Sequence, residues 1–214
     1  MRITILYDNE TLRPELSPDW GFSCLVEAHG VSILFDTGAK GEILLSNMDA
    51  LNISPAQIDE VFISHEHWDH VGGLPAILAQ RPCPVYLPVR CPAPPLADKV
   101  LRVPRFSRLH DGIYTTGTLG GVEQSLVVET TQGAVVVVGC SHPGVAEILQ
   151  VARQAGSLHA LVGGMHGFAD LALLAELQLI CPLHCTKRKR EIVARYPHST
   201  REGGAGLTLD WQGA

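Results

Sequence analysis

The chain has 214 residues, 46% of them hydrophobic and 18% charged, a globular balance that excludes fibrous and disordered chains and predicts a single domain over residues 1–214. A net charge of −6 at pH 7 argues against a nucleic-acid partner. No apolar run approaches the roughly 20 residues of a membrane span, and six cysteines without a CxxC pair are typical of reduced thiols, so we expect a cytoplasmic protein with no membrane contact.

Short apolar runs rich in Val, Ile and Leu predict β-strands along the whole chain. In chain order they are RITILYD (2–8), SCLVEAHG (23–30), VSILFDTG (31–38), EVFIS (60–64), CPVYLPV (83–89), QSLVVETT (124–131), AVVVVGC (134–140), HALVGG (159–164) and ELQLICP (176–182). His29-Gly30 and Gln132-Gly133 have the composition of hairpin turns.

Helical spacing of apolar residues predicts helices between these strands, over 41–51, 142–155, 170–177 and 187–196. The proline-rich segment 82–108 predicts irregular surface loop. Strands that alternate with helices indicate a mixed α/β fold in which helices cover the sheets.

Five of the apolar runs end on a residue that can bind a metal or orient a metal ligand. These residues are Asp36, His65, His142, His166 and His184. In α/β proteins, active sites form where the carboxyl ends of strands deliver side chains into loops. A single histidine at a strand end would mean little, but the repetition predicts a shared site.

The segment SHEHWDH (64–70) is the centre of this site. His65 and His67 are two residues apart, so in an extended segment both rings project to the same side and can share one cation. Asp69 and His70 follow across a turn and suit a second cation about 3.5–4 Å away. His142 can then complete the first site and His184 the second.

Four segments of the chain resemble the metallo-β-lactamase superfamily. They are HEHWDH with Gly72-Gly73, LFDTG (34–38), GCSH (139–142) and PLHC (182–185). The resemblance implies a four-layer αββα sandwich with a binuclear metal site at one edge. A narrower resemblance is to the branch with dihydropteridine ribofuranosyl-aminobenzene phosphate synthase activity. The segments that carry it are YDN (7–9), DWGFS (19–23), GCSHPG (139–144), GGMH (163–166) and HCT (184–186). That branch carries HCTG, whereas Lys187 replaces the final glycine here.

The resemblance implies the role of each residue of the site. One metal would be held by His65, His67 and His142, the other by Asp69, His70 and His184, and Asp36 would orient a ligand histidine. Classical hydrolases of the superfamily also have an aspartate that bridges both metals. The corresponding segment here reads GGMHG, so we expect His166 to be a pocket residue, and Asp170 to be a helix N-cap.

The predicted function is that of a metal-dependent hydrolase that acts on a small, anionic ester, lactone or phosphoester. Two divalent ions, zinc in the first place and iron or manganese as alternatives, would activate a hydroxide, with Asp69 as the catalytic carboxylate that binds metal and orients the nucleophile. One alternative is a synthase or transferase for a phosphorylated pterin-like or aminobenzoate-linked substrate. Another is an iron-dependent redox or metal-binding protein.

The partner predicted for this site is a small-molecule substrate, and the sequence makes no prediction of the oligomeric state. The residues expected to contact the substrate are His166, Lys187, Asn9, Ser23 and Arg105. Arg105 lies in the segment that we expect over the pocket, where a guanidinium suits an oxyanion. Cys140 and Cys185 adjoin proposed ligands, and we expect them to be buried or to line the pocket.

Overall fold

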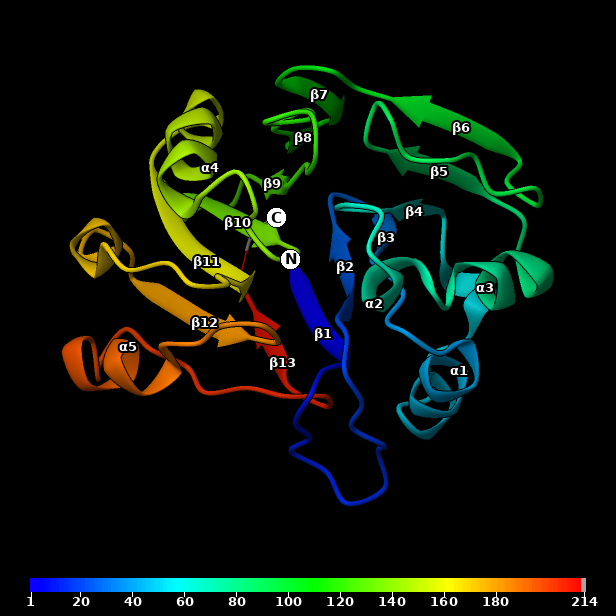
Figure 1. Ribbon diagram of the computed structural model, residues 1–214, viewed down its shortest axis with the longest axis horizontal. Coiled ribbons are helices and arrows are strands. Elements are labelled where there is room, and N and C mark those ends of the chain that lie inside the picture. Colours follow the sequence, from blue (N-terminus) through cyan, green and yellow to red (C-terminus); the bar gives the residue numbers. More distant parts are fainter. Residues whose placement is uncertain (213–214) are drawn as a thin grey trace.

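The computed structural model describes residues 1–212 as two mixed β-sheets with helices on their outer faces (Figure 1). The first sheet has the strand order β13 (Thr208–Asp210), β1 (Arg2–Tyr7), β2 (Ser23–Ala28), β3 (Val31–Phe35), β4 (Glu60–Phe62), β5 (Pro84–Leu87), β6 (Lys99–Arg102). The second has the order β12 (Leu179–Leu183), β11 (Leu158–Gly164), β10 (Ala134–Val138), β9 (Leu126–Val128), β8 (Ile113–Thr115), β7 (Ser107–His110).

Helices cover the outer face of each sheet. In Figure 1, α1 (Gly41–Ala50) and α3 (Leu74–Gln80) lie on one outer side, whereas α4 (Val145–Ala152) and α5 (Lys189–Arg195) lie on the other. The single-turn helix α2 (Trp68–Val71) precedes α3, and three short 3₁₀ turns are η1 (Pro55–Gln57), η2 (Arg153–Ala155) and η3 (Leu171–Leu174). No helix among the described residues is long and apolar enough to cross a membrane.

The alternation of side chains along the strands explains the four layers. In β10, Val135 and Val137 belong to the core between the sheets, whereas Val136 and Val138 pack against the helices on the outer face. All four are fully buried, because both faces of a covered sheet are shielded from water. The structure therefore confirms the predicted αββα sandwich.

Parallel pairing gathers strand ends at one edge of the molecule. Strand β3 is parallel to β4, and β10, β11 and β12 are parallel to one another, so the residues that follow these strands emerge together. Among those residues, four that are not glycine have positive φ angles: Asp36 (53°), Ser141 (60°), His166 (44°) and His184 (45°). Strained backbone of this kind, which costs about 1–3 kcal/mol per residue, is concentrated at functional sites.

Three predictions of local structure were wrong. Segment 82–108 is not irregular throughout, because β5, β6 and the start of β7 lie within it. The helix expected from residue 142 begins at Val145, since Gly144 has a φ of 103°. The helix expected over 170–177 is the short turn η3; Asp170 occupies its N-cap position as predicted, but its side chain makes no capping hydrogen bond.

Candidate metal centre

The first group of histidines comes from both sheets. His65 follows β4, His67 immediately precedes α2, and His142 follows β10. Nε2 of His65 lies 3.1 Å from Nδ1 of His67, and the ring of His142 lies 4.6 Å from that of His65 and 4.8 Å from that of His67. Two nitrogens bound to one tetrahedral zinc ion at about 2.05 Å would be about 3.3 Å apart, so the observed spacing suits a shared cation.

The second group contains Asp69, His70 and His184. Oδ2 of Asp69 lies 3.3 Å from Nε2 of His184 and 4.0 Å from Nε2 of His70. His184 is only 4% exposed, and its Nε2 atom is buried without forming a hydrogen bond. A buried polar atom that has a carboxylate 3.3 Å away but no hydrogen bond is poorly satisfied, and a cation bound by both groups would satisfy it. The residues present therefore fit a divalent metal ion.

Asp36 determines which nitrogens face this centre. Its fully buried carboxylate lies 2.7 Å from Nδ1 of His70, and it accepts hydrogen bonds from the backbone N–H (2.7 Å) and the hydroxyl (2.6 Å) of Ser64. The Ser64 hydroxyl in turn lies 2.9 Å from Nδ1 of His65. Nδ1 is engaged on both histidines, so Nε2 is the nitrogen available to a metal. Burial raises the pKa of Asp36 to about 7.

Glu123 has the same function for His142, and sequence reasoning missed it. Its fully buried carboxylate accepts hydrogen bonds from the backbone N–H groups of Cys140 (3.0 Å), Ser141 (2.9 Å) and His142 (2.9 Å), and lies 2.8 Å from His142 Nδ1. Burial alone would raise the pKa of Glu123, but these hydrogen bonds lower it to about 2. No recognised motif contains Glu123, which lies 19 residues before His142.

Asn9 lies against a proposed ligand rather than in a pocket. Its Oδ1 atom lies 2.9 Å from Nδ1 of His184 and accepts a hydrogen bond from the backbone of Gly21 (3.1 Å), while its amide nitrogen donates to the carbonyl of His184 (3.2 Å). Asn9 therefore orients His184, and its contact with substrate stays a prediction. Asp8, which the sequence did not single out, accepts the backbone N–H of His184 at 2.7 Å.

The imidazoles of His65 and His70 are neutral at physiological pH. Burial lowers the pKa of His65 and of His70 to about 3, because the charged form loses its hydration. A neutral imidazole offers the lone pair that a metal ion requires.

The carboxylate of the second group is oriented by Trp20. The indole N–H of Trp20 donates to Oδ2 of Asp69 at 2.8 Å and fixes the direction of that carboxylate.

The remaining substrate predictions have mixed outcomes. Ser23 is fully buried in β2 and donates to the carbonyl of Asp36 (2.8 Å), so the prediction that it contacts substrate was wrong. His166 is exposed with its ring 5.3 Å from that of His142, and the backbone N–H of the exposed Lys187 donates to the carbonyl of His166 (2.9 Å). These two residues lie beside the first group, and their contact with substrate stays a prediction.

A pocket of about 200 Å³ opens beside the first group of histidines. It is lined by His65, Glu66, His67, Pro88, Arg90, Cys91, Gly121 and Val122. Arg105, which lies between β6 and β7, is not among these lining residues, and Arg90 is the arginine that this pocket presents. Sequence reasoning missed Arg90, whose position after β5 was the available signal.

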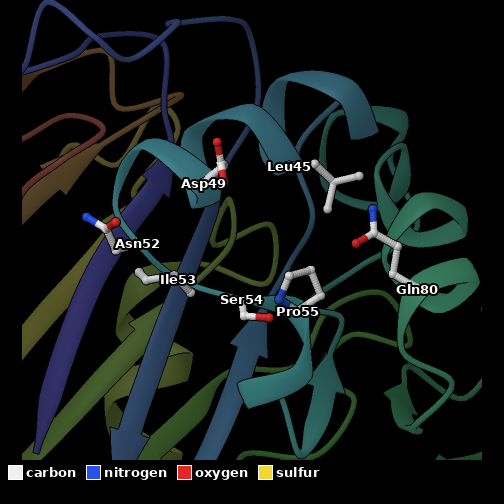
Figure 2. A pocket seen from close by; sticks show the side chains of 7 residues that line it. All are labelled: Leu45, Asp49, Asn52, Ile53, Ser54, Pro55 and Gln80. Atoms are coloured by element: carbon white, nitrogen blue, oxygen red, sulfur yellow. The ribbon is translucent and has the colours of Figure 1, made fainter.

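A larger pocket, of about 490 Å³, lies away from the histidines (Figure 2). It is lined by Leu45 and Asp49 of α1, by residues 52–55 and by Gln80 of α3. No histidine or cysteine is among these residues. Its side chains offer no set of metal-binding groups, so we place the chemistry at the histidine cluster.

Comparison with known proteins agrees with this geometry. The chain is 28% identical to the 7,8-dihydropterin-6-methyl-4-(beta-D-ribofuranosyl)-aminobenzene-5'-phosphate synthase of Methanocaldococcus jannaschii, over 82% of this chain and 84% of the relative. A shorter match, 46% identical, joins 26% of this chain to 17% of ribonuclease Z from Nanoarchaeum equitans. The crystal structure of a metal-dependent hydrolase of the beta-lactamase superfamily aligns with a TM-score of 0.81 and 26% identity, over 98% of both chains.

The family model of the metallo-beta-lactamase superfamily matches residues 21–149. This segment is more than half of the chain, and it contains β2 to β10 with Asp36, the HEHWDH motif and His142. The fold, the cluster of possible metal-binding side chains and the family model agree, and the chain belongs to the metallo-beta-lactamase superfamily.

Proposed function

We propose that this protein is a metal-dependent hydrolase with two divalent metal ions, one held by His65, His67 and His142 and the other by Asp69, His70 and His184. The observation that carries the proposal is the convergence of these donors, with the buried Nε2 atom of His184 left without a hydrogen bond. Imidazole and carboxylate ligands suit zinc, manganese and iron, and a donor set of five histidines with one carboxylate favours zinc as the resident ion.

Bound divalent ions supply a nucleophile at neutral pH and stabilise negative charge that develops on the substrate. The chain's own residues provide the orientation. Trp20 fixes one oxygen of Asp69 through its 2.8 Å hydrogen bond, so the carboxylate has a defined direction in which to orient an attacking water. Asp36 and Glu123 hold the ligand histidines in place, which keeps the site preorganised.

The pocket beside the first group indicates the class of substrate. Its volume of about 200 Å³ suits a small molecule or the reacting end of a larger one. Pro88 and Val122 give it an apolar wall, and Arg90 offers a guanidinium to an anionic group. We therefore propose a small ester, lactone or phosphoester that carries negative charge.

A hydrolysis assay of zinc-loaded protein tests this function. We expect turnover of at least one compound in a panel of carboxylic esters, lactones, thioesters and phosphodiesters. The variant His184→Ala should lower the turnover by a factor of about 100 or more, because it removes a metal ligand and the loss of a partner behind a ligand already costs about 10–100-fold. The variant of an exposed histidine, His198→Ala, should retain the turnover. Two bound zinc ions without turnover of any substrate class would contradict the proposal.

A second candidate function is that of a synthase acting on a phosphorylated pterin-like or aminobenzoate-linked compound. The 28% identity to the Methanocaldococcus jannaschii synthase over 82% of the chain favours it. Such compounds should then raise the thermal midpoint of the zinc-loaded protein, because a ligand of the native state stabilises it by mass action. An unchanged midpoint at saturating ligand would rule out this candidate.

A further inference from the structure

The thiol of Cys140 lies where both groups of metal-binding side chains meet. Cys140 follows β10 and is 3% exposed. The donor atoms of His65, Cys140 and His142 lie within 4.8 Å of one another, and so do those of His70, Cys140 and His184. Cys140 thus shares one cluster with two residues of the first group and another with two residues of the second.

Cys140 and His70 are in hydrogen-bond contact, at a distance slightly shorter than that of two ligands on one zinc ion. Sγ of Cys140 lies 3.2 Å from Nε2 of His70. A sulfur at about 2.3 Å and a nitrogen at about 2.05 Å from a tetrahedral zinc ion would be about 3.6 Å apart. Because Nδ1 of His70 is engaged by Asp36 (2.7 Å), the sulfur faces the nitrogen that is available to a metal.

A separate observation points to a cation at the same place. His184 belongs to the cluster that contains Cys140 and His70, and its buried Nε2 atom has no hydrogen bond. Backbone contacts also fix the position of Cys140. The backbone N–H of Cys140 donates to Glu123 (3.0 Å), and the neighbouring Gly139 passes so close to Ser64 that an added Cβ would lie 2.1 Å from the Ser64 hydroxyl.

We propose that Cys140, as a thiolate, bridges the two metal ions. The inference rests on the proposed dinuclear site and deepens it. The segment GGMHG lacks the aspartate that the resemblance led us to expect as a bridge, and the sulfur of Cys140 supplies a bridging ligand from a different strand end. The thiol proton leaves to solvent when the ions bind, as is general for cysteine ligands. The sequence prediction assigned Cys140 only a buried or pocket-lining role.

Zinc X-ray absorption on protein loaded with two zinc ions tests the proposal, with metal content measured on the same sample. A bridging thiolate gives about one sulfur neighbour per zinc ion at about 2.3 Å, whereas a thiolate bound to one ion gives about half a sulfur per zinc. We expect about one sulfur per zinc in the native protein. The count should stay the same in Cys185→Ala, because this neighbouring buried thiol is grouped with Cys140 and His166 and not with the proposed ligand histidines.

The isosteric variant Cys140→Ser should lose the sulfur neighbour, with circular dichroism as the check that it folds. Two bound zinc ions with half a sulfur or none in native protein would overturn the bridge while leaving the dinuclear hydrolase intact. A drop in Cys185→Ala would also overturn it, since another thiol would then supply the signal. Failure of the native protein to bind two zinc ions would overturn the proposed function as well. The native and Cys185→Ala counts decide the question even where Cys140→Ser does not load.

Discussion

At the scale of single residues, polar groups behind the histidines determine which ring nitrogen faces the centre. Asp36 lies 2.7 Å from Nδ1 of His70, Glu123 lies 2.8 Å from Nδ1 of His142, and Asn9 lies 2.9 Å from Nδ1 of His184. An acceptor at Nδ1 fixes the proton there and leaves the lone pair of Nε2 directed at the metal site. These partners should therefore influence metal affinity as well as stability.

Replacement of Asp36 by asparagine should weaken metal binding. The amide keeps the size of the side chain but gives it an NH₂ donor in place of one acceptor, which conflicts with His70 Nδ1–H and with the Ser64 hydroxyl. We expect a loss of affinity of about 10–100-fold, measured by competition with a chromogenic zinc chelator. The exposed Asp49→Asn is the matched control, and equal affinity of both variants would contradict the assigned role.

Replacement of Glu123 by glutamine should destabilise the metal-free protein. Each carboxylate oxygen accepts two hydrogen bonds at a fully buried position, and the amide nitrogen that replaces one oxygen in glutamine can accept neither of its two. Buried donors left unpaired cost about 1–3 kcal/mol of the free energy of unfolding. Urea denaturation measures this change, with the exposed Glu147→Gln as control. A loss no larger than that of the control would show that Glu123 is dispensable for the fold.

At the scale of elements, the sequence was sufficient for the strand ends but not for the loops between them. His65, His142 and His184 follow apolar strands, and this pattern is visible because strand and ligand are adjacent in the chain. Glu123 lies in the loop between β8 and β9, which reaches β4 through hydrogen bonds from Gln124 to the backbone of Ser64 and Ile63 (both 2.9 Å). Its position depends on contacts 60 residues apart in the chain, which no local pattern encodes.

The paired glycines after α2 determine how closely this helix approaches the loop after β3. A Cβ added to Gly72 would lie 2.0 Å from the carbonyl oxygen of Ala39, a backbone atom that cannot move aside cheaply. Gly72→Ala should therefore lower the free energy of unfolding by about 1–3 kcal/mol, as overpacking generally does. Gly167→Ala is the control, since an added Cβ there meets no atom within 4 Å. Equal stability of the two variants in urea would contradict this packing argument.

At the scale of the whole molecule, the proposed metal ions join the two sheets. HEHWDH follows β4 of the first sheet, whereas His142 and His184 follow β10 and β12 of the second. The apolar alternation that defines the four layers was predictable, because covered sheets require it. The positions of Arg90 and Glu123 beside the site were not predictable, because they depend on how the two sheets pack.

Removal of metal should lower the thermal midpoint of unfolding, because ions that bind only the native state stabilise it. Free zinc at about a thousandfold above its dissociation constant contributes about 4 kcal/mol per site. In a chain of this size that corresponds to a shift of roughly 8–16 °C. Calorimetry before and after dialysis against a chelator measures it, and readdition of zinc should restore the original midpoint. An identical midpoint in both states would argue against ions that join the sheets.

The most direct test of the central claim is anomalous X-ray diffraction at the zinc absorption edge, on crystals of the zinc-loaded protein. We expect two anomalous peaks about 3.5–4 Å apart. One should lie among His65, His67 and His142, and the other among Asp69, His70 and His184. A single peak, or zinc bound away from these six side chains, would contradict the dinuclear metal centre.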